Sequence, residues 1–255
     1  MLVVVKNILY QLYESQLTRE LDPARVPRHV GVILDGNRRW AKTTGGKASD
    51  GHRRGASKIS EFLSWCAEVD IEVVTLWLLS TDNLSRDKDE VRDLLDIIVT
   101  TVESLAATGK FRLHHVGDMS SLDESSAARL TAAIDSTAGA TGILVNVAIA
   151  YGGRFEILEA VRSFIAKKAD EGLSGHEIAE AVCDSAIEEN LYTRGQPDPD
   201  LVIRTSGEQR LSGFMPWQTV HSEYYFCEAY WPDFRRTDFL RALRDYAMRD
   251  RRKGK

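Results

Sequence analysis

Short apolar runs alternate with longer amphipathic segments along most of this chain, and this alternation constrains the fold more than any other feature. The amphipathic segments repeat their apolar residues at helical spacing, whereas the short runs read as buried strands. Strands that alternate with helices form right-handed βαβ units and a parallel sheet. The pattern predicts strands over 29–33, 71–79, 111–116, 143–150, 201–203 and 224–227, and helices over 5–21, 51–66, 91–105, 122–137, 153–170, 174–190 and 237–249.

We therefore expect a single α/β domain over 1–255, with a mainly parallel sheet of about six strands flanked by helices. Residues 1–26 form an N-terminal helical extension in this interpretation, and the Gly-, Thr- and Ser-rich segment 41–50 is predicted to be a mobile loop. Apolar residues make up 43% of the 255 residues, which is enough for a substantial core.

The overall charge and the cysteines exclude several classes of protein. A net charge of −5 gives no electrostatic case for nucleic-acid binding. Cys66, Cys183 and Cys227 lie too far apart for a zinc motif and suggest no disulfide framework. The apolar run 2–5 is too short for a signal peptide or a membrane span, so we expect a cytoplasmic protein. The first helix is expected to pack or dimerise, with contact to a membrane surface as the alternative.

One stretch, residues 34–40, carries the most specific chemistry. Asp35 follows the first predicted strand, and Gly36 ends that strand before Asn37, Arg38 and Arg39 open a helix. A carboxylate beside two guanidinium groups and a helix N-terminus suits a magnesium ion that carries a diphosphate. An Asp that caps a helix, with two arginines on a solvated face, explains the stretch alone equally well.

Similar chemistry follows two other predicted strands, at 80–86 and at 204–212. The carboxyl ends of parallel strands share one edge of a sheet, so these segments converge there. The arginines that follow the strands are Arg38, Arg39, Arg86, Arg204 and Arg210, and together they suggest a pocket for more than one phosphate group. Position alone predicts that His52 is solvated, that Asn83 is a turn residue and that Glu223 belongs to an edge strand.

The common nucleotide signatures are absent from the sequence. There is no Gly-x-x-x-x-Gly-Lys-Ser/Thr loop and no Gly-x-Gly-x-x-Gly turn, which argues against an NTPase or a dinucleotide oxidoreductase. A nucleotide-binding module with unrelated chemistry would fit the fold but would leave the converging motifs unexplained.

A set of motifs, in order along the chain from about Pro27, matches a known family. They are Asp35-Gly36-Asn37-Arg38-Arg39-Trp40-Ala41, Gly51-His52-x-x-Gly55, Ser80-Thr81-Asp82-Asn83, Tyr151-Gly152-Gly153-Arg154, and Ile203-Arg204-Thr205-Ser206-Gly207-Glu208 with Ser222-Glu223. The set resembles the cis-prenyltransferases, also called the undecaprenyl diphosphate synthase family. Arg252-Lys253-Gly254 also resembles an Arg-x-Gly tail that some members carry, although a solvated basic tail explains it equally well.

The resemblance implies a magnesium-dependent homodimer that condenses isopentenyl diphosphate with an allylic diphosphate and forms a new cis double bond. It implies that Asp35 and Glu223 bind the metal, and that Asn83 helps to remove the proton. A neutral amide is a poor base, so we expect Asn83 to position a diphosphate oxygen or a water that takes the proton. The substrate-binding residues implied are Gly36, Asn37, Arg38, Arg39, Trp40, His52, Ser80, Thr81, Asp82 and Arg86, with Arg204, Arg210, Leu211 and Ser212 on the side of isopentenyl diphosphate.

Leu78 bears on the length of the product. Side chains alternate along a strand, so Leu76 and Leu78 should face the same way as Ser80 and line the tunnel for the growing chain. In the family, a bulky residue at the position of Leu78 accompanies short products, which predicts (2Z,6E)-farnesyl diphosphate made from geranyl diphosphate. A long-chain polyprenyl diphosphate synthase and a non-catalytic partner subunit are the alternatives, and Leu78 read simply as a core residue also remains open.

Overall fold

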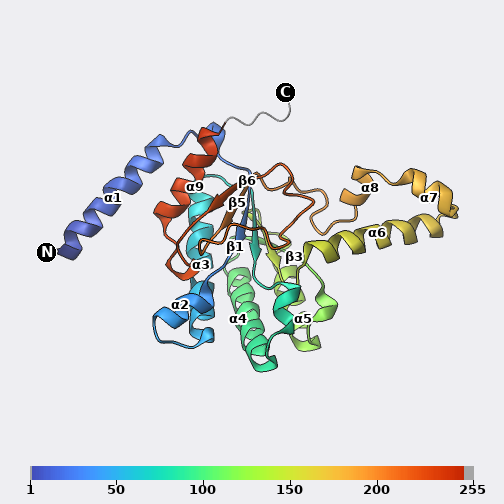
Figure 1. Ribbon diagram of the computed structural model, residues 1–255, viewed down its shortest axis with the longest axis horizontal. Coiled ribbons are helices and arrows are strands. Elements are labelled where there is room, and N and C mark those ends of the chain that lie inside the picture. The colour runs from blue at the N-terminus through green and yellow to red at the C-terminus, as the bar shows by residue number, and fades with distance from the viewer. Residues whose placement is uncertain (1, 250–255) are drawn as a thin grey trace.

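A sheet of six parallel strands forms the centre of the molecule (Figure 1). The computed structural model describes residues 2–249, and the side chains of residue 10 and of residues 12–249; the predicted tail motif at 252–254 lies outside them. The strand order is β3-β4-β2-β1-β5-β6, and each neighbouring pair is parallel. The strands are β1 (His29–Ile33), β2 (Val73–Trp77), β3 (Arg112–Val116), β4 (Leu144–Ala148), β5 (Leu201–Arg204) and β6 (Glu223–Phe226). The predicted fold class is confirmed.

The helices also follow the predicted order, with two differences. The segment 41–50 is not simply a loop, because α3 begins inside it, where the Asp50 carboxylate accepts the backbone N–H of Lys47 at 2.9 Å and caps the first turn. The stretch 174–190 is broken by extended backbone at Val182 and Cys183. The helices are α1 (Leu2–Glu20), α2 (Asn37–Thr43), α3 (Ala48–Glu68), α4 (Lys88–Ala107), α5 (Glu124–Asp135), α6 (Gly153–Asp170), α7 (Gly175–Ala181), α8 (Asp184–Glu188) and α9 (Arg236–Met248).

The two faces of the sheet are covered differently. Helices α3, α4, α5 and α9 bury the larger apolar core, around residues such as Phe62, Ile98 and Phe239. The other face carries a smaller core around Tyr151 and Phe214, where irregular chain covers much of the sheet. Figure 1 shows α1 leading away from the body on one side and α6, α7 and α8 projecting on the other. Within residues 2–249, no helix is long and apolar enough to cross a membrane.

The strand register determines which loops meet. Ile33, the last residue of β1, pairs with Trp77 of β2 and with Arg204 of β5. The segments that follow these three strands therefore leave the sheet at the same level and on the same edge. This carboxyl edge is where ligands bind in open α/β sheets.

Candidate active site

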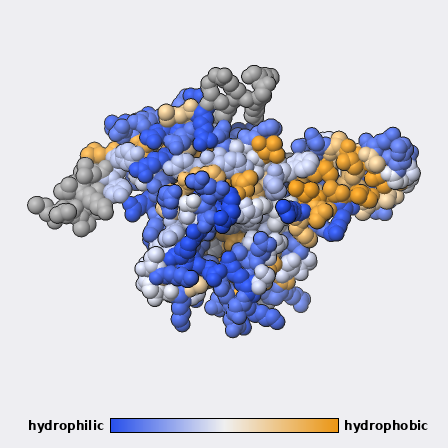
Figure 2. Space-filling model, viewed as in Figure 1, coloured by the Kyte–Doolittle hydropathy of each residue, from blue (hydrophilic) through white to orange (hydrophobic). Residues whose placement is uncertain are grey.

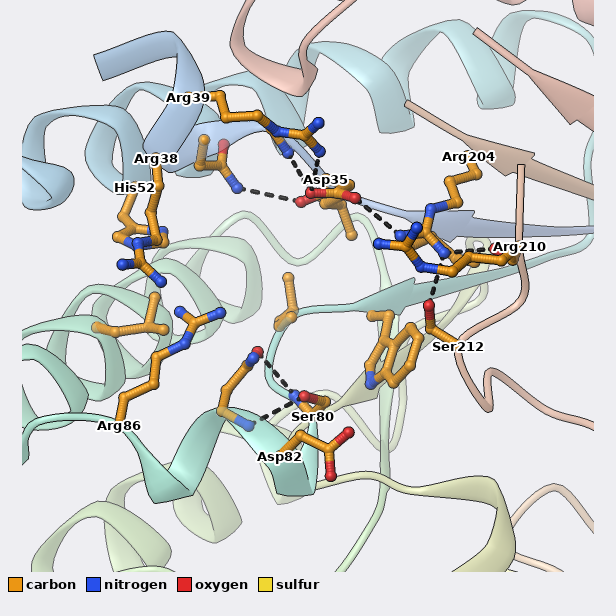
Figure 3. A pocket seen from close by; sticks show the side chains of 18 of the residues that line it. Asp35, Arg38, Arg39, His52, Ser80, Asp82, Arg86, Arg204, Arg210 and Ser212 are labelled. Atoms are coloured by element: carbon orange, nitrogen blue, oxygen red, sulfur yellow. Dashed lines mark hydrogen bonds and ion pairs between the residues drawn. The ribbon is translucent and has the colours of Figure 1, made fainter. Parts of the chain in front are cut away.

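A polar cavity of about 470 Å³ opens at the carboxyl edge of the sheet, between the segments that follow β1, β2 and β5 (Figure 3). Most of the predicted site residues line it, although they come from segments far apart in sequence. These are Asp35, Gly36, Asn37, Arg38, Arg39, His52, Leu78, Ser80, Asp82, Asn83, Arg86, Arg204, Arg210 and Ser212. The expectation that the three strand ends converge is confirmed.

Asp35 lies at the turn between β1 and α2. Gly36 follows with φ = 100°, and an added Cβ there would lie 2.6 Å from the Tyr230 ring, so only glycine fits this turn. The Oδ1 atom of Asp35 accepts the N–H of Gly36 at 2.6 Å and a guanidinium N–H of Arg39 at 3.2 Å. Its Oδ2 atom accepts Nη2 of Arg204 at 2.9 Å. The carboxylate is thus held between two arginines at the wall of the cavity.

Arg204 is almost fully buried, which is unusual for an arginine. Besides Asp35, its guanidinium donates to the hydroxyl of Ser212 at 2.8 Å and to the backbone carbonyl of Arg210. Burial alone would raise the pKa of Asp35, but the ion pair with Arg204, supported by Arg39, outweighs it and lowers that pKa below its ordinary value. Asp35 is therefore ionised at neutral pH, and Arg204 ties the segments after β1 and β5 together.

Arg39 and Arg210 share a carboxylate that the sequence analysis did not single out. Arg39 donates to Glu208 at 3.0 Å and to the hydroxyl of Ser206 at 2.6 Å, and its guanidinium lies over the ring of Tyr230. Arg210 pairs with the other oxygen of Glu208. The structure therefore groups Arg39 with Arg204 and Arg210, on one side of the cavity.

Arg38 and Arg86 form a second cationic group on the other side of the cavity, beside the ring of His52 (Figure 3). Glu90, in the first turn of α4, lies between the two arginines, 3.3 Å from Nη1 of Arg86 and 3.5 Å from Nε of Arg38. Burial, and then the positive charge of Arg86, lower the pKa of His52 to about 4, so His52 is neutral at pH 7. Its Nε2 atom is buried and has no hydrogen-bond partner in the described part of the chain.

The Ser80–Asn83 segment forms its own closed turn below these groups. The Ser80 hydroxyl accepts the backbone N–H of Asn83 at 3.1 Å, and the Asn83 side-chain oxygen accepts the backbone N–H of Ser80 at 3.3 Å. This reciprocal cap fixes Asn83 by its oxygen. The amide nitrogen of Asn83 is left as a donor at the wall of the cavity.

A small apolar cavity of about 40 Å³ adjoins the polar one, between α3 and α4. Leu34, Leu78 and Leu94 line both, as do Asn37 and His52, so the two spaces are neighbours that share a wall. The remaining apolar wall comes from Ala56, Ile59, Ile97, Ile98 and Trp231. Leu78 thus lies at the site, in the wall that the polar and the apolar cavity share. Leu76 does not, because it is fully buried in the core and lines neither cavity.

Trp40, Thr81 and Leu211 were predicted to bind substrate but do not line the polar cavity. Thr81 packs against Gly152, where an added Cβ would lie 2.6 Å from its hydroxyl oxygen. This close contact explains the Tyr151-Gly152-Gly153 motif, since it lets the start of α6 support the Ser80–Asn83 segment. The backbone N–H of Thr81 also donates to the carbonyl of Tyr151 at 3.0 Å.

Glu223 lies at the wrong edge of the sheet for the predicted role. It is the first residue of β6 and pairs with Leu201, the first residue of β5, whereas Asp35 follows the last residue of β1. Its carboxylate forms an ion pair with Arg249. Within one chain, Asp35 and Glu223 therefore lie at opposite edges of the sheet, and the structure does not bring these two predicted metal ligands together.

Several residues that shape the site were not predicted from the sequence. Lys42 and Trp77 line the polar cavity, and the indole of Trp77 stacks on Phe214 with 5.4 Å between ring centroids. Glu90 was detectable, because it lies four residues after Arg86 at the start of a predicted helix, a spacing that pairs opposite charges. Trp77 was also detectable as the neighbour of Leu78 that points to the opposite face of the strand.

Asp35 is the residue best suited to hold a divalent cation. No group of three or more metal-ligating side chains occurs among the residues that the structure describes. Magnesium is commonly held by one or two carboxylates together with substrate phosphates and waters, and does not need a cage of protein ligands. An ionised carboxylate on the wall of an arginine-lined cavity fits that pattern.

The fold and the cavity define an α/β protein whose arginine-lined cavity suits an anionic head group and lies beside a small apolar space. Comparison with known proteins agrees. A family model described as "Putative undecaprenyl diphosphate synthase" matches residues 33–254. The chain therefore belongs to the undecaprenyl diphosphate synthase family of prenyltransferases, as its motifs predicted.

Several relatives resemble the chain over nearly its whole length. Isoprenyl transferase 1 of Streptomyces avermitilis is 56% identical, covering 98% of this chain and 97% of the relative. The (2Z,6E)-farnesyl diphosphate synthase of Thermobifida fusca is 55% identical, covering 96% and 97%. The crystal structure of lavandulyl diphosphate synthase from Lavandula x intermedia, in complex with dimethylallyl diphosphate, has a TM-score of 0.84 at 34% identity and covers 91% of this chain and 100% of that one.

Proposed function

We propose that this chain condenses isopentenyl diphosphate with geranyl diphosphate and releases (2Z,6E)-farnesyl diphosphate. The observation that carries the proposal is the junction of the arginine-lined cavity with an apolar space of only about 40 Å³, which meet at Leu78. The arginine-lined cavity suits a diphosphate, and the apolar space beside it lies where the start of an isoprenoid tail would be placed. Relatives 50–55% identical over nearly the full chain are named (2Z,6E)-farnesyl diphosphate synthase, which supports the same activity.

Each of the two arginine groups is proposed to bind one of the two diphosphates. In this proposal Arg38, Arg86 and His52 bind the allylic diphosphate, next to the entrance of the apolar space that holds its tail. Arg204 and Arg210, with the Ser212 hydroxyl, bind isopentenyl diphosphate on the other side. Guanidinium groups suit this task because they donate several hydrogen bonds in a planar fork to phosphate oxygens.

The reaction breaks the bond between the allylic carbon and its diphosphate and joins that carbon to the terminal alkene carbon of isopentenyl diphosphate. Negative charge builds on the leaving oxygens, and fixed arginines stabilise it without reorganising. A proton then leaves the adjacent carbon, and its electron pair forms the cis double bond. Asn83, held through its oxygen by Ser80, donates its amide N–H to the diphosphate oxygen or water that accepts this proton.

We also propose magnesium as the cofactor, with Asp35 as its protein ligand. The bound ion would offset the negative charge of the departing diphosphate. Without an ion, Arg39 and Arg204 neutralise the Asp35 carboxylate, and both can turn toward phosphate oxygens when substrate enters. Calorimetric titration with an unreactive geranyl thiolodiphosphate, with and without magnesium, tests the assignment. We expect magnesium to tighten binding to the wild-type protein but not to Asp35→Ala.

A homodimer is the third part of the proposal, with the projecting α6 region as the contact surface. Leu158 and Ile165 of α6 and Val182 beside α8 are about half exposed, and Figure 2 shows apolar surface gathered over this region. Exposed apolar patches of this kind mark protein interfaces. Sedimentation should show a dimer, and Leu158→Glu with Ile165→Glu should yield monomer. A wild-type monomer at micromolar concentration would refute the assignment.

The activity is tested directly by incubating the purified protein with magnesium, labelled isopentenyl diphosphate and either geranyl or all-trans-farnesyl diphosphate. We expect a fifteen-carbon product, formed mainly from geranyl diphosphate, and none from the Asp35→Ala variant. Products of about fifty carbons would instead indicate a long-chain synthase. Lack of any incorporation by the wild-type protein would favour the non-catalytic partner subunit, which the retention of Asp35, Asn83 and Arg204 argues against.

A further inference from the structure

Asp35 lies beyond the paired residues of the sheet, so hydrogen bonds outside the sheet ladder must hold its backbone. The ladder of β1 ends at Ile33, two residues earlier. The side chain is no fixed anchor either, because its partners Arg39 and Arg204 are groups that the proposed function assigns to diphosphate. Once substrate draws these arginines away, whatever holds the peptide groups of Asp35 decides where the carboxylate points.

Thr205 supplies that anchor through one hydroxyl group. The backbone N–H of Asp35 donates to its Oγ1 atom at 2.9 Å and also to the carbonyl of Ile33 at 2.9 Å. The same hydroxyl donates to the carbonyl of Asp35 at 2.7 Å and lies 3.3 Å from the carbonyl of Ile33. A hydroxyl can do both, since it carries one donor and two acceptor positions. The backbone N–H of Trp231 donates to the same carbonyl at 3.0 Å. Both peptide groups of Asp35 are therefore tied to segments that follow other parts of the sheet.

Thr205 itself cannot move freely. It is fully buried, directly after the last residue of β5, and its backbone N–H contacts the carbonyl of Ile33 at 3.4 Å. It lines neither cavity, so it cannot touch substrate. The next residue, Ser206, is anchored by its backbone N–H to the carbonyl of Ala229 at 2.7 Å.

We propose that Thr205 is a positioning residue for the prenyl-transfer reaction, and that its hydroxyl holds Asp35 in the geometry that the loaded site requires. The inference rests on the proposed function. Small displacements of a reacting or charge-stabilising group cost large factors in rate, because the transition state tolerates little misalignment. The loss of this hydroxyl should therefore lower kcat, while the arginines that bind isopentenyl diphosphate stay in place.

Thr205→Val removes the hydroxyl and keeps the branched shape, whereas Thr205→Ser keeps the hydroxyl and removes a methyl group. The chain offers a matched control in Thr137, which is also buried, accepts the backbone N–H of Leu113 at 2.9 Å and donates to the carbonyl of Ile134 at 2.7 Å. Thr137 lines neither cavity. Thr137→Val thus makes the same chemical change at a place without a role in the site.

We expect Thr205→Val and Thr137→Val to lower the melting temperature by similar amounts. Only Thr205→Val should lower kcat, by at least tenfold, which corresponds to about 1.4 kcal/mol. The KM for isopentenyl diphosphate should change less than twofold, and Thr205→Ser should recover most of the rate. Calorimetric titration with geranyl thiolodiphosphate provides a second readout, in which Thr205→Val should lose most of the tightening that magnesium causes in the wild-type protein.

The inference is overturned if Thr205→Val keeps kcat within twofold of Thr137→Val, or if Thr205→Ser is as slow as Thr205→Val. It is also overturned if magnesium tightens analogue binding equally in Thr205→Val and in the wild type. If the wild-type protein shows no prenyl transfer, the proposed function is refuted instead. The wild-type assay, run beside the variants, therefore distinguishes a failure of the proposed function from a failure of the inference about Thr205.

Discussion

Leu78→Ala should lengthen the product, because Leu78 stands at the junction of the diphosphate cavity and the apolar space. The apolar space holds about 40 Å³ at present. Leucine to alanine removes three carbon atoms, roughly 90 Å³ if each is given about 30 Å³, the share of a water molecule in the liquid. By the same measure a five-carbon unit needs about 150 Å³, so the change opens more than half of that space beside the cavity, and we expect some product of twenty carbons or more beside the fifteen-carbon one.

The same change costs stability, and the cost can be estimated separately. Three buried carbon groups contribute about 2.4 kcal/mol at about 0.8 kcal/mol each, and partial exposure of Leu78 reduces this to roughly 2 kcal/mol or less. A folded, active variant is therefore expected. Its unfolding free energy is measured by denaturant titration and its products by chain-length analysis after dephosphorylation.

Leu79→Ala is the matched control. Leu79 is the next residue, is fully buried in the core and lines neither cavity. It should lose more stability than Leu78→Ala, about 3 kcal/mol or more, yet keep the fifteen-carbon product. The reasoning fails if Leu78→Ala makes only the wild-type product, or if Leu79→Ala lengthens the chain equally, since a general loosening of the core would then explain the result.

Three further outcomes follow from the charged groups. Arg204→Lys should raise the KM for isopentenyl diphosphate at least tenfold in steady-state assays, because one ammonium cannot serve Asp35, Ser212 and a phosphate together. Burial lowers the pKa of His29 to about 4, so stability is complete above about pH 6.5 and falls as pH drops toward 4; denaturant titration should show a loss of about 2 kcal/mol from this group at pH 5. A bound diphosphate should raise the low pKa of His52, so calorimetry in buffers of different ionisation enthalpy should detect proton uptake at pH 5.5.

The alternation of apolar runs and amphipathic segments was sufficient to predict the parallel sheet and most helices, because each pattern is set by local sequence. The start of α3 was not predicted. Its first residues are small and polar, as in loops, and the helix is favoured there by the cap between Lys47 and Asp50. Likewise, nothing in the composition of 174–190 marks the break at Val182 and Cys183 that the tertiary fold imposes.

Glu223 is the predicted metal ligand that the structure does not bring to the cavity within one chain. Residues that follow parallel strands meet at the carboxyl edge, and this rule placed Asp35, Ser80 and Arg204 correctly. Glu223 is the first residue of its strand, so the same rule sends it to the opposite edge, where β6 begins. The motif resemblance assigned it to the metal, but no resemblance states whether two residues meet within one chain. That depends on the register, which a four-residue strand does not reveal.

The carboxylates between the arginines explain how so many cations share one cavity before substrate arrives. Asp35 lies between Arg39 and Arg204, Glu90 lies between Arg38 and Arg86, and Glu208 lies between Arg39 and Arg210. Each carboxylate offsets repulsion that would otherwise spread the arginines apart. An entering diphosphate therefore exchanges one set of ion pairs for another instead of creating them in water. The positive charges that stabilise a leaving group are thus gathered at the cavity before substrate arrives.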